Sequence, residues 1–178
     1  MTSLSASSKA TDSRERGPAP AQKIAPFLWF DDQAEEAVNL YTSLFDNSRI
    51  LRVTRYGDGG PGPKGSVMTV DFVLAGQQFV ALNGGPHFKF TEAISFVVNC
   101  ETQEEVEHFW DQLTADGGQE SQCGWLKDMY GLSWQIVPTI LMKLLQDPDK
   151  EKANRVMQAM LKMRKIETGK LLEAAEQK

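Results

Sequence analysis

The sequence predicts an α+β fold built from two paired βαβββ modules that form a cleft, followed by a C-terminal helix. Two observations carry this prediction. A short apolar run followed by an amphipathic helix occurs twice at one constant offset along the chain, which indicates a duplicated unit. Glycine and proline clusters then separate three strand-like runs after the first helix and two after the second.

The first copy begins with the strand-like run "KIAPFLWFDD". Its two carboxylates, Asp31 and Asp32, are placed to cap the helical pattern "QAEEAVNLYTSLF" that follows. The next strand candidates are "RILRVTRYG", "SVMTVDFVLAG" and "QQFVALNGG", and the pair Ala75-Gly76 predicts a tight hairpin between the last two.

The second copy begins with "ISFVVNCETQEEVEHFWDQLTADGG", which reads as a strand, a threonine-and-acid start signal, a helix and a glycine stop. At the constant offset, Phe27 falls opposite Phe96. The helices align as Glu35, Glu36, Ala37, Leu40, Tyr41 and Leu44 against Glu104, Glu105, Val106, Phe109, Trp110 and Leu113. We expect a disordered leader at 1–22, modules at 23–86 and 87–146, and a helical extension at 147–178.

The composition excludes several classes of function. A net charge of -5 over 178 residues argues against a sequence-independent grip on nucleic acid. No apolar run is long enough to span a membrane. The two cysteines, Cys100 and Cys123, form no redox or zinc motif, so we expect a soluble cytoplasmic protein.

Three segments carry a resemblance to a known family: "PFLWFDDQAEEAVNLYTSLF", "NGGPHFKFTEAISFVVNCETQEEVEHFWDQL" and "CGWLKDMYGLSWQIVP". They resemble the PhnB-like, or 3-demethylubiquinone-9 3-methyltransferase-like, branch of the vicinal oxygen chelate superfamily, which includes glyoxalase I, extradiol dioxygenases and antibiotic resistance proteins. The tail "DKEKANRVMQAMLKMRKIETGKLLEAA" is similar to that branch as well. The resemblance implies a glyoxalase-like fold and a homodimer.

The best-known members of the superfamily hold a metal through one side chain on the first strand and one on the last strand of each copy. The corresponding positions in this chain are Ala25, Pro26 or Phe27, Val80 to Asn83, Ala93, Ile94 or Ser95, and Gln135. Divalent metals prefer imidazole and carboxylate, so we predict no standard metal site. We predict no cofactor either, because the loop "GDGGPGPKG" joins strand to strand and its prolines remove backbone donors.

The segment "CGWLKDMYGLSWQIVP" predicts two strands around a turn. Strand alternation puts Ser133 and Gln135 on one face and Trp134 on the other, and it puts Trp125 and Lys127 on a common face. In the family geometry the Gln135 face lines the cleft. The candidate ligand residues are Gln135, Trp125, Lys127 and Ser133, together with Asn83 at the end of "QQFVALNGG" and His87 in the loop at the junction of the two copies. The alternative is that both tryptophans belong to the core and that Lys127 and Asp128 form a surface pair.

Three functions remain open. The first is a metal-free protein that binds a small organic ligand in the cleft. The second is an enzyme of the same fold, either a metal-dependent glyoxalase- or dioxygenase-type enzyme or the methyltransferase of the family description. The third is a dimeric interaction module, for which Val156, Met157, Met160, Met163 and Ile166 offer an apolar stripe on the C-terminal helix.

Overall fold

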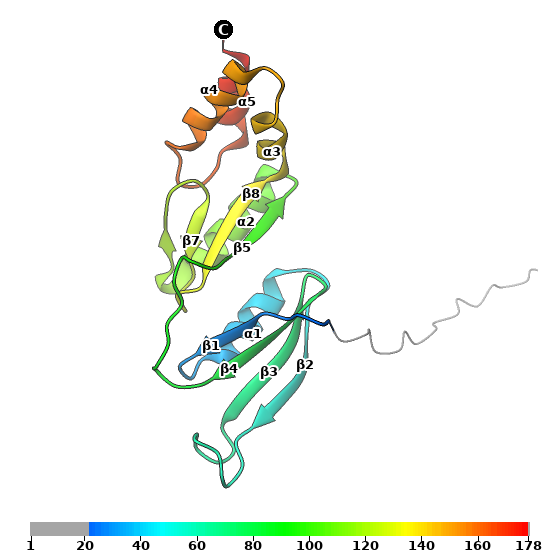
Figure 1. Cartoon of the computed structure of the whole chain (residues 1–178), viewed down its shortest axis with the longest axis vertical. Coiled ribbons are helices and arrows are strands. Elements are labelled where there is room, and N and C mark those ends of the chain that lie inside the picture. The colour runs from blue at the N-terminus through cyan, green and yellow to red at the C-terminus, as the bar shows by residue number, and fades with distance from the viewer. Residues whose placement is uncertain (1–21, 178) are drawn as a thin grey trace, which may run out of the picture.

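The computed structural model describes residues 22–177 (Figure 1), so the predicted leader at 1–22 lies almost wholly outside the described residues. The first module comprises β1 (Phe27–Phe30), α1 (Ala34–Leu44), β2 (Arg49–Arg55), β3 (Val67–Leu74) and β4 (Gln77–Asn83). The second comprises β5 (Ser95–Cys100), α2 (Gln103–Thr114), the short 3₁₀ helix η1 (Ala115–Gly117), β6 (Gln119–Glu120), β7 (Trp125–Lys127) and β8 (Ser133–Pro138).

The two modules share one topology. Sheet A has the strand order β1-β4-β3-β2 and sheet B the order β5-β8-β7-β6, and in each sheet the first strand pairs in parallel with the last. The predicted hairpin is confirmed, because Ala75 and Gly76 both have positive φ between β3 and β4. The duplication inferred from the sequence is therefore a duplication of architecture.

Each helix covers one face of its sheet, as the apolar spacing predicts. In α1 the buried residues are Ala34, Ala37, Val38 and Tyr41, and in α2 they are Val106, Trp110 and Leu113. The Thr102 hydroxyl caps α2 by accepting a hydrogen bond from Glu105 N, as the start signal predicts. The opposite face of each sheet carries no helix of its own module (Figure 1).

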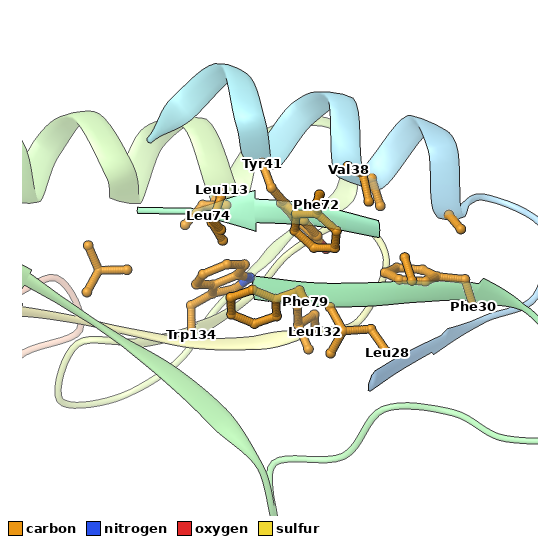
Figure 2. Close-up of a cluster of buried hydrophobic side chains, with 14 of the residues drawn as sticks. Leu28, Phe30, Val38, Tyr41, Phe72, Leu74, Phe79, Leu113, Leu132 and Trp134 are labelled. Atoms are coloured by element: carbon orange, nitrogen blue, oxygen red, sulfur yellow. The ribbon is translucent and has the colours of Figure 1, made fainter. Parts of the chain in front are cut away.

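The modules meet through their helix-covered sides in one continuous hydrophobic core (Figure 2). Phe45, at the end of α1, stacks on Phe109 of α2 with ring centroids 4.7 Å apart. Tyr41 meets Trp134 edge to face at 5.3 Å, and Phe79 meets Phe96 in the same way. Burial of these aromatic surfaces stabilises the contact between the two modules.

The predicted alignment of the first strands of the two modules, which placed Phe27 opposite Phe96, is wrong by one residue. Phe27 is 59% exposed on the bare face of sheet A, whereas Phe96 lies on the helix-covered face of sheet B and contacts Trp134. Successive strand residues point to opposite faces, so an offset that aligns the helices fails on the strands if one connection differs by a single residue.

The C-terminal part forms three helices, α3 (Thr139–Leu145), α4 (Lys150–Met160) and α5 (Thr168–Glu176), where the sequence predicts one. They enclose a second apolar cluster that includes Val156, Met163 and Ile166. Most of the predicted methionine stripe is thus internal to this unit, and Met157 is its exposed member. The predicted boundary at residue 147 falls between α3 and α4.

The C-terminal unit is fastened to the second module by backbone hydrogen bonds. Cys123 N donates to Met163 O at 2.8 Å, and Gly124 N donates to Arg164 O at 2.7 Å. Among residues 22–177 there is no helix with the length and apolarity needed to cross a lipid bilayer.

Candidate functional site

Four of the six predicted site residues lie together on the face of sheet B that α2 leaves bare. Trp125 is the register partner of Gln135, and Lys127 is the register partner of Ser133. Trp134 points to the other side, where it is 2% exposed in the core. We call the surface formed by Ser95, Trp125, Lys127, Ser133 and Gln135 the polar face.

Ser95 joins the polar face through the parallel pairing of β5 with β8. Its register partner is Ser133, and Gln135 Nε2 donates a 2.9 Å hydrogen bond to Ser95 Oγ. This bond fixes the orientation of the Gln135 amide and uses one of its donors, so its carbonyl oxygen and second N–H are available to a ligand or water. From the sequence, Ser95 is considered only as a possible metal ligand, and its place in this site is not predicted.

The Ser133 hydroxyl has no hydrogen-bond partner among the described residues although the residue is fully buried. A buried hydroxyl without a partner costs free energy, and folded proteins contain few such groups. Its position beside Lys127 and Gln135 means that the missing partner would have to sit at the polar face.

Lys127 is paired with Glu92, which lies in the segment between β4 and β5. Lys127 Nζ and Glu92 Oε1 are 2.5 Å apart, and the hydrogen bond from Lys127 lowers the pKa of the Glu92 carboxyl below its usual value. Within residues 22–177, Lys127 forms no ion pair with Asp128, the partner proposed from the sequence. Nothing local in the sequence marks Glu92, because the contact depends on the path of the inter-module segment.

Asp128 closes the turn before β8. Its carboxylate accepts hydrogen bonds from the backbone N–H groups of Tyr130 and Leu132, from Trp134 Nε1 at 2.9 Å and from the Tyr41 hydroxyl at 2.7 Å. Burial raises the pKa of Asp128, while the hydrogen bonds from Trp134 and Tyr41 act in the opposite direction. Asp128 thereby holds the turn from which Ser133 and Gln135 extend.

Asn83 lies apart from the polar face, and its amide is used elsewhere. Asn83 Oδ1 accepts a 2.8 Å hydrogen bond from Ala34 N at the start of α1, and Asn83 Nδ2 donates to Val67 O. The expected cap from Asp31 or Asp32 is wrong: Gln33 is the N-cap, without a side-chain cap bond, and the Asn83 amide satisfies the N–H of Ala34 instead.

His87 also lies apart from Gln135. It is exposed and lines a hollow of about 660 Å³ with Asn83, Tyr56 and the acidic residues that flank the start of α1, Asp31, Asp32, Glu35 and Glu36. The structure therefore gathers Asn83 and His87 at the end of sheet A, and Gln135, Trp125, Lys127 and Ser133 on sheet B.

A groove of about 580 Å³ runs between the modules. Its lining is largely apolar and includes Phe45, Phe79, Phe96 and Phe109, with Ser95 at its border. Gln135 does not line it. The groove and the polar face thus meet near Ser95, at the N-terminal end of β5.

The donor set does not fit a divalent metal. At the expected positions sheet A offers the apolar side chains of Phe27 and Val80, and sheet B offers the Ser95 hydroxyl and the Gln135 amide. Hydroxyl and amide groups bind Zn²⁺ and similar ions weakly without imidazole or carboxylate companions. Residues 22–177 contain no group of three histidine, cysteine or acidic side chains placed to hold an ion.

The structure also offers no strand-to-helix phosphate cradle at the glycine-rich loop. Residues 57–65 connect β2 to β3, two antiparallel strands, with no helix between them. Tyr56 packs against Gly60 and Gly62 and donates a 2.7 Å hydrogen bond to Asn83 O. Cys100 is a poor nucleophile candidate, since burial raises the pKa of its thiol to about 12.

Comparison with known proteins identifies the family of the chain. The family described as 3-demethylubiquinone-9 3-methyltransferase matches residues 22–137. The PhnB protein of Bacillus cereus, whose description names the same methyltransferase, is 42% identical with a TM-score of 0.61, over 66% of this chain and 100% of that one. The family match ends within β8, so the C-terminal helical unit lies beyond it. No curated protein matches the chain.

More distant structures share the fold alone. The Pseudomonas aeruginosa protein PA1353 is 20% identical with a TM-score of 0.55, over 66% of this chain and 98% of that one. FosX of Listeria monocytogenes, a fosfomycin resistance protein, is 15% identical with a TM-score of 0.51, over 71% of this chain and 98% of that one. The chain belongs to the PhnB-like, or 3-demethylubiquinone-9 3-methyltransferase, family.

Proposed function

We propose that this protein binds a small organic molecule on the polar face of sheet B, without a metal of the standard superfamily kind and without a nucleotide-type cofactor. One observation carries the proposal: the Ser133 hydroxyl is buried without a partner between Lys127 and Ser95. A ligand oxygen at this position would satisfy it, and the oriented Gln135 amide would add a second polar contact.

Trp125 supplies the apolar part of the proposed site. It is half-buried on β7, beside Gln135, and its indole makes no hydrogen bond within residues 22–177. An aromatic wall beside a few fixed polar groups is the usual composition of a small-molecule site. The proposed ligand therefore has a flat or apolar portion and at least one oxygen.

We propose that the polar face is closed by a second copy of the chain in a homodimer. The bare faces of the two sheets expose apolar side chains, with Phe27 at 59% and Val97 at 51% exposure. The bare face of sheet A also holds a hollow of about 360 Å³ lined by Leu51, Asp71 and Val80. Covering these faces would bury apolar surface that the single chain leaves in water.

The unpaired cysteines also support a cytoplasmic location.

A small-molecule screen by thermal unfolding tests the proposal. The wild-type chain is compared with Gln135→Leu, which keeps the volume but removes the amide, and with Asn83→Ala as the control for a predicted residue that the structure places elsewhere. Compounds that raise the melting temperature of the wild type should also stabilise Asn83→Ala and should fail on Gln135→Leu. Compounds that stabilise all three proteins equally would contradict a site at Gln135.

The homodimer is tested by sedimentation of the wild type and of Val97→Asp, which places a charge on the bare face of sheet B. The wild type should sediment as a dimer and the variant as a monomer. A monomeric wild type across the micromolar range would overturn this part of the proposal.

A further inference from the structure

The ion pair between Lys127 and Glu92 joins two unequal partners. Lys127 is held in β7, and only 32% of its side chain is exposed. Glu92 lies outside any helix or strand, and 62% of its side chain is exposed. The cation is therefore a fixed part of the polar face, whereas the anion is brought to it by the segment between the modules, which passes the lower end of β7 and β8 in Figure 1.

No other described carboxylate is within ion-pair distance of Lys127. Its register partners, Gln119 and Ser133, are uncharged. The carboxylate of Asp128, next in sequence, is occupied by Tyr41 and Trp134 on the opposite side of the sheet. Without Glu92, the polar face would present one ammonium group next to one hydroxyl, and neither would have a partner.

Both of these groups can donate a hydrogen bond, and an ammonium can only donate. The group missing between them is thus an acceptor, and next to a lysine the best acceptor is an anion. The Gln135 amide is tied by its own N–H to Ser95, and it can donate its second N–H to the same ligand.

We propose that the ligand of the polar face is an organic oxyanion, a carboxylate, phosphate or phosphonate, and that Glu92 is an intramolecular stand-in that this oxyanion displaces from Lys127. This inference rests on the proposed function, because it names the class of molecule that the polar face binds. Ser133 Oγ donates to the same anion, and the organic part of the ligand lies on Trp125.

Displacement of Glu92 from Lys127 costs little free energy, because the Glu92 side chain is largely exposed. Such pairs contribute little, since solvent screens them and both side chains lose freedom. Glu92 therefore competes with the ligand without blocking it. Removal of its charge should tighten the binding of an oxyanion by about two- to fivefold, the range that corresponds to a weak surface pair.

The test uses three simple aromatic probes: benzoate, phenylphosphonate and the uncharged benzamide. Their dissociation constants are measured from the shift of the Trp125 indole N–H resonance in the wild type, Glu92→Gln and Lys127→Met. Glu176→Gln is the matched control, because it removes the same charge from α5. We expect Glu92→Gln alone to tighten both anions by about two- to fivefold, with benzamide unchanged, and Lys127→Met to weaken the anions about tenfold.

Two results would overturn the inference, and they can be told apart. If benzamide binds and Glu92→Gln tightens the anions no more than Glu176→Gln does, the polar face binds ligands but Glu92 is not a stand-in for an anion. If none of the three probes shifts the Trp125 resonance, both the oxyanion and the binding role of the polar face are contradicted.

Discussion

The Tyr41 hydroxyl donates a 2.7 Å hydrogen bond to the carboxylate of Asp128, and this bond ties α1 of the first module to the turn between β7 and β8 of the second. Both residues are buried, with Tyr41 fully covered and Asp128 at 3% exposure. The bond links the module interface directly to the turn from which the polar face is built.

Replacement of Tyr41 by phenylalanine removes one of the four donors of a buried carboxylate and keeps the ring. We expect a loss of about 1.5–3 kcal/mol in the free energy of unfolding, because hydrogen bonds to charged groups are the stronger kind. Urea denaturation measures it. Tyr130→Phe is the control, since no hydrogen bond of the Tyr130 hydroxyl occurs within the described residues, and it should cost less than about 0.5 kcal/mol. Equal losses would mean that the Tyr41–Asp128 bond contributes nothing of its own.

The Asp128 carboxyl also predicts a pH dependence of stability. Burial raises its pKa in the folded state, so between its unfolded and folded pKa values the folded chain binds more protons than the unfolded one. The stabilising contribution is then complete below the unfolded pKa and is lost as the pH rises through the folded pKa. The free energy of unfolding of the wild type should fall across this acidic window relative to that of Asp128→Asn, as measured by denaturation at a series of pH values. Parallel curves for the two proteins would contradict the raised pKa.

Gly124 lies where the C-terminal unit meets sheet B. Its φ is nearly the same as that of Gly131, so a comparison of alanine variants at the two positions separates the steric cost of a Cβ from the cost of the backbone conformation. Gly124 has φ 83, and a Cβ there would lie 2.7 Å from Ile136 O and 2.9 Å from Ile166 Cδ1. Gly131 has φ 85 and open space around it. Gly131→Ala should cost about 1–2 kcal/mol for the left-handed backbone, and Gly124→Ala about 1–3 kcal/mol more for the overlap. A Gly124→Ala variant no less stable than Gly131→Ala would exclude the close packing described here.

Ser133 and Ser95 face each other across β5 and β8, yet their replacements should act in opposite directions. Ser133→Ala deletes a buried hydroxyl without a partner and should raise the free energy of unfolding by about 0.5–2 kcal/mol. Ser95→Ala removes the acceptor of the Gln135 amide and should lower it by about 0.5–1.5 kcal/mol. Both should weaken ligand binding. Loss of stability in Ser133→Ala would show that its hydroxyl already has a partner.

Local patterns in the sequence were enough to predict the helices of the two modules and the two faces of β8. Apolar spacing placed α1 and α2, and period-two alternation separated Ser133 and Gln135 from Trp134, as the register confirms. These features depend on neighbours within a few residues. They can therefore be predicted from the sequence pattern before any tertiary contact is known.

The remaining features depend on contacts between distant segments. Asn83, at the end of the last strand of its copy, was expected to reach the same cavity as Gln135, but the N-terminus of α1 lies next to Asn83, and Ala34 N donates a hydrogen bond to its amide oxygen. The partner of Lys127 was sought in its neighbour Asp128, and it is Glu92 instead. The one-residue slip between Phe27 and Phe96 arises in a connection whose length the helix pattern does not report.

The measurement that tests the central claim most directly is a titration of the ¹⁵N-labelled chain with small organic molecules, followed at the four indole N–H resonances. Trp110 and Trp134 donate to Glu120 and Asp128, and Trp29 donates to Gly85 O, so these three serve as internal references. The account predicts that a ligand shifts the Trp125 resonance together with the side-chain amide of Gln135 and leaves the references in place. Ligands that shift Trp29 instead, with Trp125 and Gln135 unchanged, would contradict it and move the site away from the polar face.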